Sequence, residues 1–219
     1  MPRRLYLLRH GQTDANVLNT IAGRSPDMPL NETGLRQAAL TAKALCQAAI
    51  HKIYMSPALR ARQTAKQVFE HHVPTVFGET QENFAEINFG VLEGMSYEEA
   101  KELHPDVLEE YRETPSKCVF PQGESMVDAY NRIGRGINKI LIEHPCNESV
   151  LIVSHGGAMA LIFLYVFDLD MDKTLHSIRH NNCGLSIIDL ENMDKWNAPQ
   201  HKPRIVCIND ISHLKKEHY

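Results

Sequence analysis

The chain has 219 residues, of which 43% are hydrophobic and 23% are charged, and its formal net charge is −4. These values are typical of a globular protein and argue against a collagen, a coiled coil or a disordered chain. A nucleic-acid partner bound through its phosphates requires a basic face on the protein. The net charge is negative and the sequence contains no Lys/Arg-rich block, so no such face is indicated. We therefore expect no nucleic-acid partner.

Membrane association and secretion are not expected either. The longest strongly apolar run, 158–167, is about half of the ~20 residues that span a bilayer. The N-terminus reaches the charged pair Arg9-His10 too soon to hold the apolar core of a signal peptide. The five cysteines are scattered and show no CxxC spacing, which is typical of reduced thiols in the cytoplasm. We expect a cytoplasmic location.

The first third of the chain predicts two strand–helix pairs. The apolar run 5–8 is consistent with a buried strand, and apolar positions recur at helical spacing from Leu35 to Ala49, with Asn31 or Thr33 as the N-cap. Residues 53–55 predict another short strand. Ser56-Pro57 then opens a helix that we expect to run to about His71.

The middle of the chain, 74–123, is less periodic and acidic, and it predicts irregular chain and short helices over one side of the domain. Its acids from Glu98 to Glu113 are interpreted as a solvated face. Ser125 with Asp128 resembles a capping box for a long amphipathic helix that ends near His144-Pro145.

The last third predicts a buried strand at 150–153, an apolar helix at 158–167 and strands at 185–190 and 204–208. Alternating strands and helices predict a mostly parallel sheet covered on both faces. We therefore expect an α/β fold with three layers, α/β/α, in a single domain, 1–219. Residues 84–125 form an inserted, acidic, helical and cap-like subregion.

Two of the predicted strands end in the same way, with a His followed by a Gly. The two runs are Leu7-Leu8-Arg9-His10-Gly11 and Ile152-Val153-Ser154-His155-Gly156. Ligands of open α/β sheets bind beyond the carboxyl ends of strands, and glycine allows close approach. If the strands are neighbours, both imidazoles meet there; the alternative is two polar strand ends with capping roles.

Arg60 adds a cation about one turn into the helix that follows the strand 53–55. Helix N-termini attract anions, and a guanidinium can bind two oxygens of an oxyanion at once. Arg62 faces elsewhere and is expected to be solvated. Two Arg and two His at one sheet edge predict an anion site, with a phosphoryl group as the favoured anion.

These motifs resemble the histidine phosphatase superfamily, also called phosphoglycerate mutase-like. The resemblance covers residues 5 to about 160 in five ordered blocks: Leu8-Arg9-His10-Gly11-Gln12-Thr13 with Asn16; Leu30-Asn31-Glu32-Thr33-Gly34 with Gln37-Ala38; Ser56-Pro57 with Arg60 and Gln63-Thr64-Ala65; Glu86 with Gly90 and Glu93-Gly94; and Ser154-His155-Gly156-Gly157. The resemblance implies a phosphoglycerate mutase-like fold.

The resemblance also implies catalytic roles for five residues. His10 would be the nucleophile that becomes phosphohistidine. Arg9, Arg60 and His155 would hold the oxygens of the transferred phosphoryl group, and Glu86 would donate a proton to the leaving oxygen. A neutral imidazole is a competent nucleophile near pH 7. Among the acids nearby, Glu82 and Glu93 are the competing candidates for the proton donor.

Further contacts to the substrate are implied for five residues. Asn16 and Gly23 resemble the loop that binds the phosphate, and Gln12 and Thr13 complete the first loop. Gly156 lies beside the second histidine and joins this substrate-binding set.

No metal site or other cofactor is predicted. His71-His72 is interpreted as a surface pair at a helix end. His176 and His180 are four residues apart and could share a metal, but no third ligand follows at a recognisable spacing.

The family divides into phosphatases and cofactor-dependent mutases, and the sequence favours a phosphatase. Mutase relatives carry extra cations after the motif with the acid, together with a Tyr where this chain has Phe89, and no adjacent Arg pair lies between Gly94 and Gly123. We therefore predict a metal-independent phosphomonoesterase that acts on small phosphorylated metabolites. A phosphoglycerate mutase and an inactive phospho-ligand binder are the alternatives.

The substrate and the oligomeric state, a homodimer included, stay open. We expect specificity to lie in 84–125 and in the tail after Asn181-Asn182.

Overall fold

A six-stranded sheet forms the centre of the computed structural model, which describes residues 3–24, 27–71, 77–144, 148–190 and 203–215. The strand order is β3-β2-β4-β1-β5-β6. Strands β3, β2, β4 and β1 are parallel, whereas β5 and β6 run antiparallel to their neighbours. The strands are β1 Arg3–Arg9, β2 Lys52–Met55, β3 Phe77–Thr80, β4 Val150–Ser154, β5 Leu185–Leu190 and β6 Arg204–Asp210. The predicted mostly parallel sheet is confirmed.

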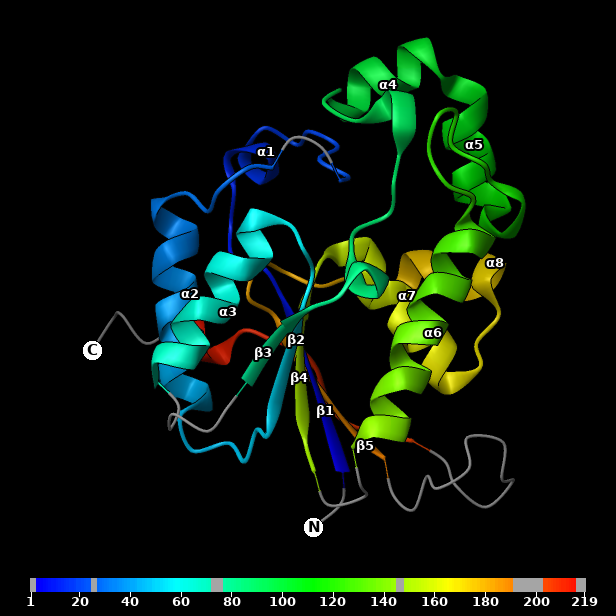
Figure 1. Ribbon diagram of the computed structural model, residues 1–219. Helices are drawn as coiled ribbons and strands as arrows, with labels where there is room; N and C mark the ends of the chain where they lie inside the picture. Colours follow the sequence, from blue (N-terminus) through cyan, green and yellow to red (C-terminus); the bar gives the residue numbers. More distant parts are fainter. Residues whose placement is uncertain (1–2, 25–26, 72–76, 145–147, 191–202, 216–219) are drawn as a thin grey trace.

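Helices cover both faces of this sheet (Figure 1). One face packs against α2 (Glu32–Leu45) and α3 (Leu59–His71), and the other against α6 (Met126–Glu143) and α7 (Gly156–Phe167). Two hydrophobic clusters fill the spaces between the layers, one on each side. The three-layer α/β/α prediction is therefore confirmed.

The local sequence explains where these helices begin. The side chain of Asn31 accepts a hydrogen bond from the backbone N–H of Gly34 at 2.9 Å, so Asn31 caps α2. In the same way the Ser125 hydroxyl accepts from the N–H of Asp128 at 3.0 Å and caps α6. Helix α7 carries almost only apolar side chains because it is buried on nearly every side.

Short helices lie above the carboxyl ends of the parallel strands (Figure 1). Those between β3 and α6 are η1 Glu82–Phe84, η2 Gly90–Leu92, α4 Tyr97–Leu103, α5 Pro105–Glu113 and η3 Pro115–Lys117. Outside this region the chain forms α1 Asp14–Val17, α8 Met171–Thr174, η4 Leu175–Ser177 and η5 Ser212–Lys215. The segment from η1 to α6 is called the cap below.

Two predicted details are wrong. Residues 77–80 form β3 and pair with β2, although the sequence predicts irregular chain there. The pattern Phe-Gly-Glu-Thr contains a Gly and a Glu and shows no apolar alternation, so β3 depends on pairing with β2. Helix α3 begins at Leu59, and Arg60 is therefore its second residue instead of lying a turn into it.

Among the described residues, no helix combines the length and the apolar character that crossing a bilayer requires.

Candidate active site

Three neighbouring parallel strands end at the same point of the sheet and position two histidines and a serine. The N–H of His10, directly after β1, donates to the carbonyl of Ser154 at 2.9 Å. The N–H of Ser56, directly after β2, donates to the carbonyl of Val153 at 2.9 Å. The rings of His10 and His155 approach edge to face, with their centroids 5.1 Å apart. The two imidazoles therefore meet at one sheet edge.

His10 is buried and has one ring nitrogen fixed by the backbone. Its Nδ1 lies 2.7 Å from the carbonyl oxygen of Gly11, so Nδ1–H donates and Nε2 keeps its lone pair. Burial, followed by the charges of Arg9 and Arg60, holds the pKa of His10 well below its usual value of 6.5. A buried, neutral imidazole with a free Nε2 is suited to act as a nucleophile.

His155 is held by Ser56. The Nε2 of His155 lies 2.6 Å from the hydroxyl oxygen of Ser56, which also accepts from the N–H of Ala58 at 3.3 Å. Ser56 can thus donate its proton to Nε2, which leaves Nδ1–H as a donor. Nδ1 is buried and has no partner among the described residues. Burial, with the charge of Arg60 next, holds the pKa of His155 well below 6.5.

Arg9 and Arg60 are each anchored through one nitrogen to a backbone carbonyl. Arg9 Nη1 donates to the oxygen of His180 at 2.6 Å, and Arg60 Nη2 donates to the oxygen of Gly23 at 2.7 Å. Within the described part of the chain, the buried atoms Arg9 Nε, Arg60 Nε and Arg60 Nη1 have no hydrogen-bond partner. Buried donors left unpaired are costly, and an anion at this position would satisfy them.

Glu86 lies at the N-terminus of α7. Its carboxylate accepts from the N–H groups of Ile87 at 3.0 Å, Gly157 at 3.2 Å and Ala158 at 2.9 Å. The competing acids lie elsewhere: Glu82 borders a smaller cavity, and Glu93 accepts from the N–H of Arg24 at 2.9 Å. Glu86 is therefore the carboxylate, among the described residues, that lines the main cavity.

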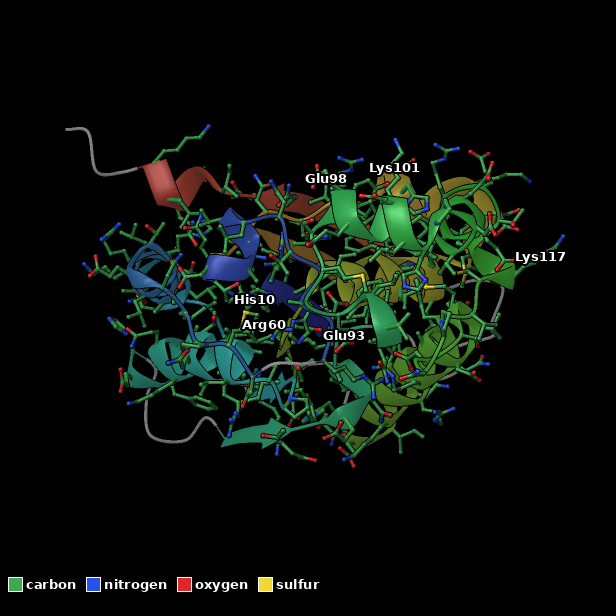
Figure 2. All side chains as sticks on the ribbon, turned by 90° about the horizontal axis from the view of Figure 1, so that it is seen from above. His10, Arg60, Glu93, Glu98, Lys101 and Lys117 are labelled. Carbon is green, nitrogen blue, oxygen red and sulfur yellow. The ribbon has the colours of Figure 1, made fainter. Side chains whose placement is uncertain are left out.

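The main cavity has a volume of about 540 Å³ and lies beneath the cap. Arg9, His10, Arg60 and Glu86 form its polar end. His10 and Arg60 lie near the centre of the molecule in the view from above, whereas Lys101 and Lys117 lie toward the outside (Figure 2). The opposite wall is mainly apolar, with residues such as Phe89, Leu92, Leu108, Tyr111 and Phe120. A second cavity of about 230 Å³ borders Ser56 and His155 and shares Gly23 and Glu86 with the first.

Three of the predicted substrate-binding residues line the main cavity: Asn16, Gly23 and Gly156. Gln12 and Thr13 do not. The N–H of Gln12 donates to the side chain of Gln37 at 2.9 Å, and Thr13 caps α1 in a reciprocal pair with Asn16. These two residues shape the first loop.

The remaining histidines considered as surface residues or metal ligands, together with Arg62, make separate contacts. His176 Nε2 donates to the carbonyl of Tyr111 at 2.8 Å, whereas the buried His180 ring contacts the Ser186 hydroxyl at 2.8 Å. His71 is exposed, and His72 lies outside the described residues. Arg62 forms an ion pair with Asp27 at 3.4 Å. In the described part of the chain, no three His, Cys, Asp or Glu side chains are grouped as metal ligands would be.

Two further residues, Asn182 and Arg132, hold segments of the site in place, and the sequence motifs do not identify them. The Asn182 side chain donates to the carbonyl of His10 at 3.1 Å and to Asn16 Oδ1 at 3.0 Å. The Arg132 side chain, which is buried, donates to carbonyls of the segment that carries Glu86. A lone Arg on the apolar face of an amphipathic helix is the one sequence signal that could have indicated Arg132.

The fold and the site together define an α/β protein in which two histidines and two arginines meet at the carboxyl edge of the sheet. Residues 5–199 match the model of the histidine phosphatase superfamily (branch 1), and the chain belongs to this family.

Similar proteins carry phosphatase and mutase names. "Uncharacterized phosphatase PhoE" of Bacillus subtilis is 33% identical over 209 residues, which cover 95% of both chains. "Phosphoserine phosphatase 1" of Hydrogenobacter thermophilus is 31% identical over 188 residues, covering 86% of this chain and 87% of its own. A Yersinia pestis relative whose name contains "phosphoglycerate mutase GpmB" is 31% identical, with 85% of each chain covered.

The solved structure of Bacillus stearothermophilus YhfR has the same fold. It superposes with a TM-score of 0.85 at 27% identity and covers 97% of this chain and 100% of its own. The matches to the family and to its named phosphatases support phosphatase activity.

Proposed function

We propose that this protein is a phosphomonoesterase that needs no metal and hydrolyses small phosphorylated metabolites through a phosphohistidine on His10. The observation that carries the proposal is the set of buried donors beside His10 that have no partner among the described residues, namely on Arg9, Arg60 and His155. A phosphoryl group is an anion whose oxygens would accept hydrogen bonds from all three side chains. Phosphatase-named relatives support the same reaction class.

In the first step the Nε2 lone pair of His10 attacks phosphorus, and the bond to the ester oxygen breaks. Because the Nδ1–H of His10 donates to Gly11, the ring stays in the tautomer that exposes the lone pair to the cavity. Arg9, Arg60 and His155 stabilise the charge on the three phosphoryl oxygens as it is redistributed. Glu86 gives a proton to the leaving oxygen.

In the second step water attacks the phosphorus of phosphohistidine, and the N–P bond breaks. The Glu86 carboxylate accepts the proton of this water, so the enzyme returns to its starting state and releases inorganic phosphate. Positioning and electrostatic stabilisation carry most of the catalysis of phosphoryl transfer, and the cationic end of the cavity is suited to both.

The phosphohistidine is tested with a ³²P-labelled phosphomonoester and rapid acid or base quench. We expect a base-stable, acid-labile label on His10 in the wild type and none in His10→Ala. Turnover after dialysis against a chelator tests the independence from metals. A label on another residue would contradict the proposed intermediate, and the absence of turnover between pH 5 and 8 would favour the inactive phospho-ligand binder.

The mutase alternative is tested with 3-phosphoglycerate and a trace of 2,3-bisphosphoglycerate. We expect inorganic phosphate, because the cap presents Phe89 and no lysine or arginine to the cavity among the described residues. Rapid formation of 2-phosphoglycerate without free phosphate would identify a mutase instead.

The proposal includes a cytoplasmic location and a small-molecule partner only. The described cysteines Cys46, Cys118, Cys183 and Cys207 are free thiols, which supports a reducing compartment.

A further inference from the structure

Arg179 is a third guanidinium at the cavity that the proposed reaction does not use. It follows η4, is exposed and lines the main cavity together with Arg9 and Arg60. Within the described part of the chain, its side chain has no hydrogen bond and no ion pair. The neighbouring His180 carbonyl binds Arg9 at 2.6 Å, so the backbone beside Arg179 is fixed at the phosphate end.

Most exposed arginines among the described residues pair with a carboxylate, but Arg179 and Arg135 do not. The chain is acidic overall, and several exposed arginines form ion pairs: Arg36 with Glu32, Arg62 with Asp27 and Arg112 with Glu113. Among the described residues, Glu86 is the one carboxylate that lines the main cavity, and it is held by the backbone N–H groups of α7. Arg179 thus faces a cavity in which the described protein residues leave it no anion.

The cap cannot supply this second charge. Its cavity wall consists of apolar side chains such as Phe89, Leu92 and Leu108, together with the Tyr97 and Tyr111 rings. The cap cations Lys101, Arg112 and Lys117 do not line the cavity. A substrate that fills the space between His10 and the cap would therefore place its carbon skeleton against the cap. Among the described residues, a second anionic group away from Arg9 and Arg60 would meet its cation at Arg179.

Resting on the proposed phosphatase function, we propose that the substrate is a small phosphomonoester with a second anionic group, a carboxylate or a further phosphate, bound by Arg179. Guanidinium recognises either group through two parallel hydrogen bonds. Arg179 is then a specificity-determining residue that binds the non-reacting end of the substrate, and its contribution appears mainly as binding.

Matched substrates isolate the second anion. 3-Phosphoglycerate and glycerol 3-phosphate differ only in a carboxylate against a hydroxymethyl group, and phosphoserine and phosphoethanolamine differ only in the carboxylate. A sugar bisphosphate is compared with the corresponding monophosphate to test recognition of a second phosphate. We expect kcat/KM to be about 10- to 100-fold higher for the anionic member of at least one pair, as for hydrogen bonds to charged groups.

The variant Arg179→Gln should lower kcat/KM for the member with the second anion about 10- to 100-fold more than for its partner without it, so that the preference is lost, and surface substitutions rarely disturb the fold. Lys101→Gln removes an equal charge from the cap outside the cavity and should keep the preference (Figure 2). An equal rate for both members of every pair, or a preference that survives Arg179→Gln, would overturn the inference.

Binding separates this inference from the proposed function. Calorimetric Kd values for the same pairs are measured on His10→Ala and on His10→Ala with Arg179→Gln, and they need no turnover. If the wild type hydrolyses nothing but the anionic member still binds more tightly through Arg179, the proposed function fails alone. If neither member binds differently, the inference fails whatever the activity.

Discussion

The guanidinium of Arg132 on α6 donates to the backbone carbonyl of Glu86 at 3.3 Å. The same side chain donates to the carbonyl of Ala85 at 2.9 Å and pairs with the Glu124 carboxylate at 2.9 Å. The side chain of Arg24 donates to the Glu86 carbonyl from the first loop, at 3.0 Å. The position of the Glu86 carboxylate is therefore set by a buried cation on a helix whose remaining buried face is mostly apolar.

On the proposed mechanism, this arrangement predicts that Arg132 is a positioning residue for proton transfer. In Arg132→Lys the fork of donors is lost, and we expect kcat for an alkyl phosphate to fall by about 10- to 100-fold, as misplacement of a catalytic group does. For an aryl phosphate with a good leaving group, kcat should fall by less, because the leaving oxygen needs no proton. Arg135→Lys, an exposed position on the same helix, is the matched control. An equal fall in kcat for both substrates would indicate a general destabilisation of the protein instead.

The Glu86 side chain itself should show a stronger dependence on the leaving group. Glu86→Gln keeps the shape but cannot donate or accept the proton, so kcat/KM for an alkyl phosphate should fall by about 100-fold or more. The loss on p-nitrophenyl phosphate should be smaller, which a plot of log kcat/KM against leaving-group pKa would show as a steeper slope. Glu82→Gln, exposed and outside the main cavity, should leave that slope unchanged.

Gly23 in the first loop and Gly94 in the cap both have positive φ and offer a matched test. Gly23 has φ +49° and its carbonyl binds Arg60, and a Cβ there would overlap the Glu93 carboxylate. Gly94 has φ +89° and open space around a Cβ. Replacing either glycine by Ala should lower the free energy of unfolding by about 1 kcal/mol, because a residue with a Cβ is strained at positive φ.

Only Gly23→Ala should also displace Arg60 and raise KM for a phosphomonoester, by about 10-fold for one weakened hydrogen bond to a charged group. KM and the urea midpoint of both variants are measured together. A rise in KM of the same size in Gly94→Ala would contradict a specific role for Gly23.

The sequence predicted the elements and residues that follow local rules. The strand ends at His10 and His155 are marked by apolar runs that stop at a polar residue and Gly, and parallel neighbours necessarily bring such ends together. The three-layer fold followed from alternating strands and helices. The start of a helix directly after a strand predicts that Arg60 lies at the same sheet edge as the two histidines.

What the sequence did not predict depends on contacts between distant segments. Strand β3 exists because it pairs with β2. The backbone carbonyls that Arg132 binds lie more than 40 positions away in the chain, and Asn182 reaches His10 across 172 positions. Gln12 and Thr13 follow His10 in the sequence but do not line the main cavity, and their N–H groups donate to Gln37 and Asn16, contacts that no spacing rule reveals.

Stability should fall as the pH drops below about 6.5, because several buried histidines resist protonation. Burial lowers the pKa of His10, His155 and His213, and it lowers the pKa of His180 to about 4. Between pH 6.5 and these lower values the unfolded chain binds more protons than the native chain. The free energy of unfolding therefore rises with pH in this window and is lost as pH falls, by at most about 1.4 kcal/mol per pH unit for each histidine.

Urea unfolding at pH 7.5, 6.5, 5.5 and 4.5 in buffers free of phosphate measures this slope, since a bound anion would stabilise the native state. His180→Gln should reduce the slope between pH 6.5 and 4.5, because one proton-binding difference is removed. His71→Gln, an exposed histidine, should leave it unchanged. The carboxylates with lowered pKa, such as Glu79 at about 2, contribute mainly below pH 4.5 and do not mask the effect. A free energy of unfolding that stays constant from pH 7.5 to 4.5 would show that these histidines titrate alike in the native and unfolded chains.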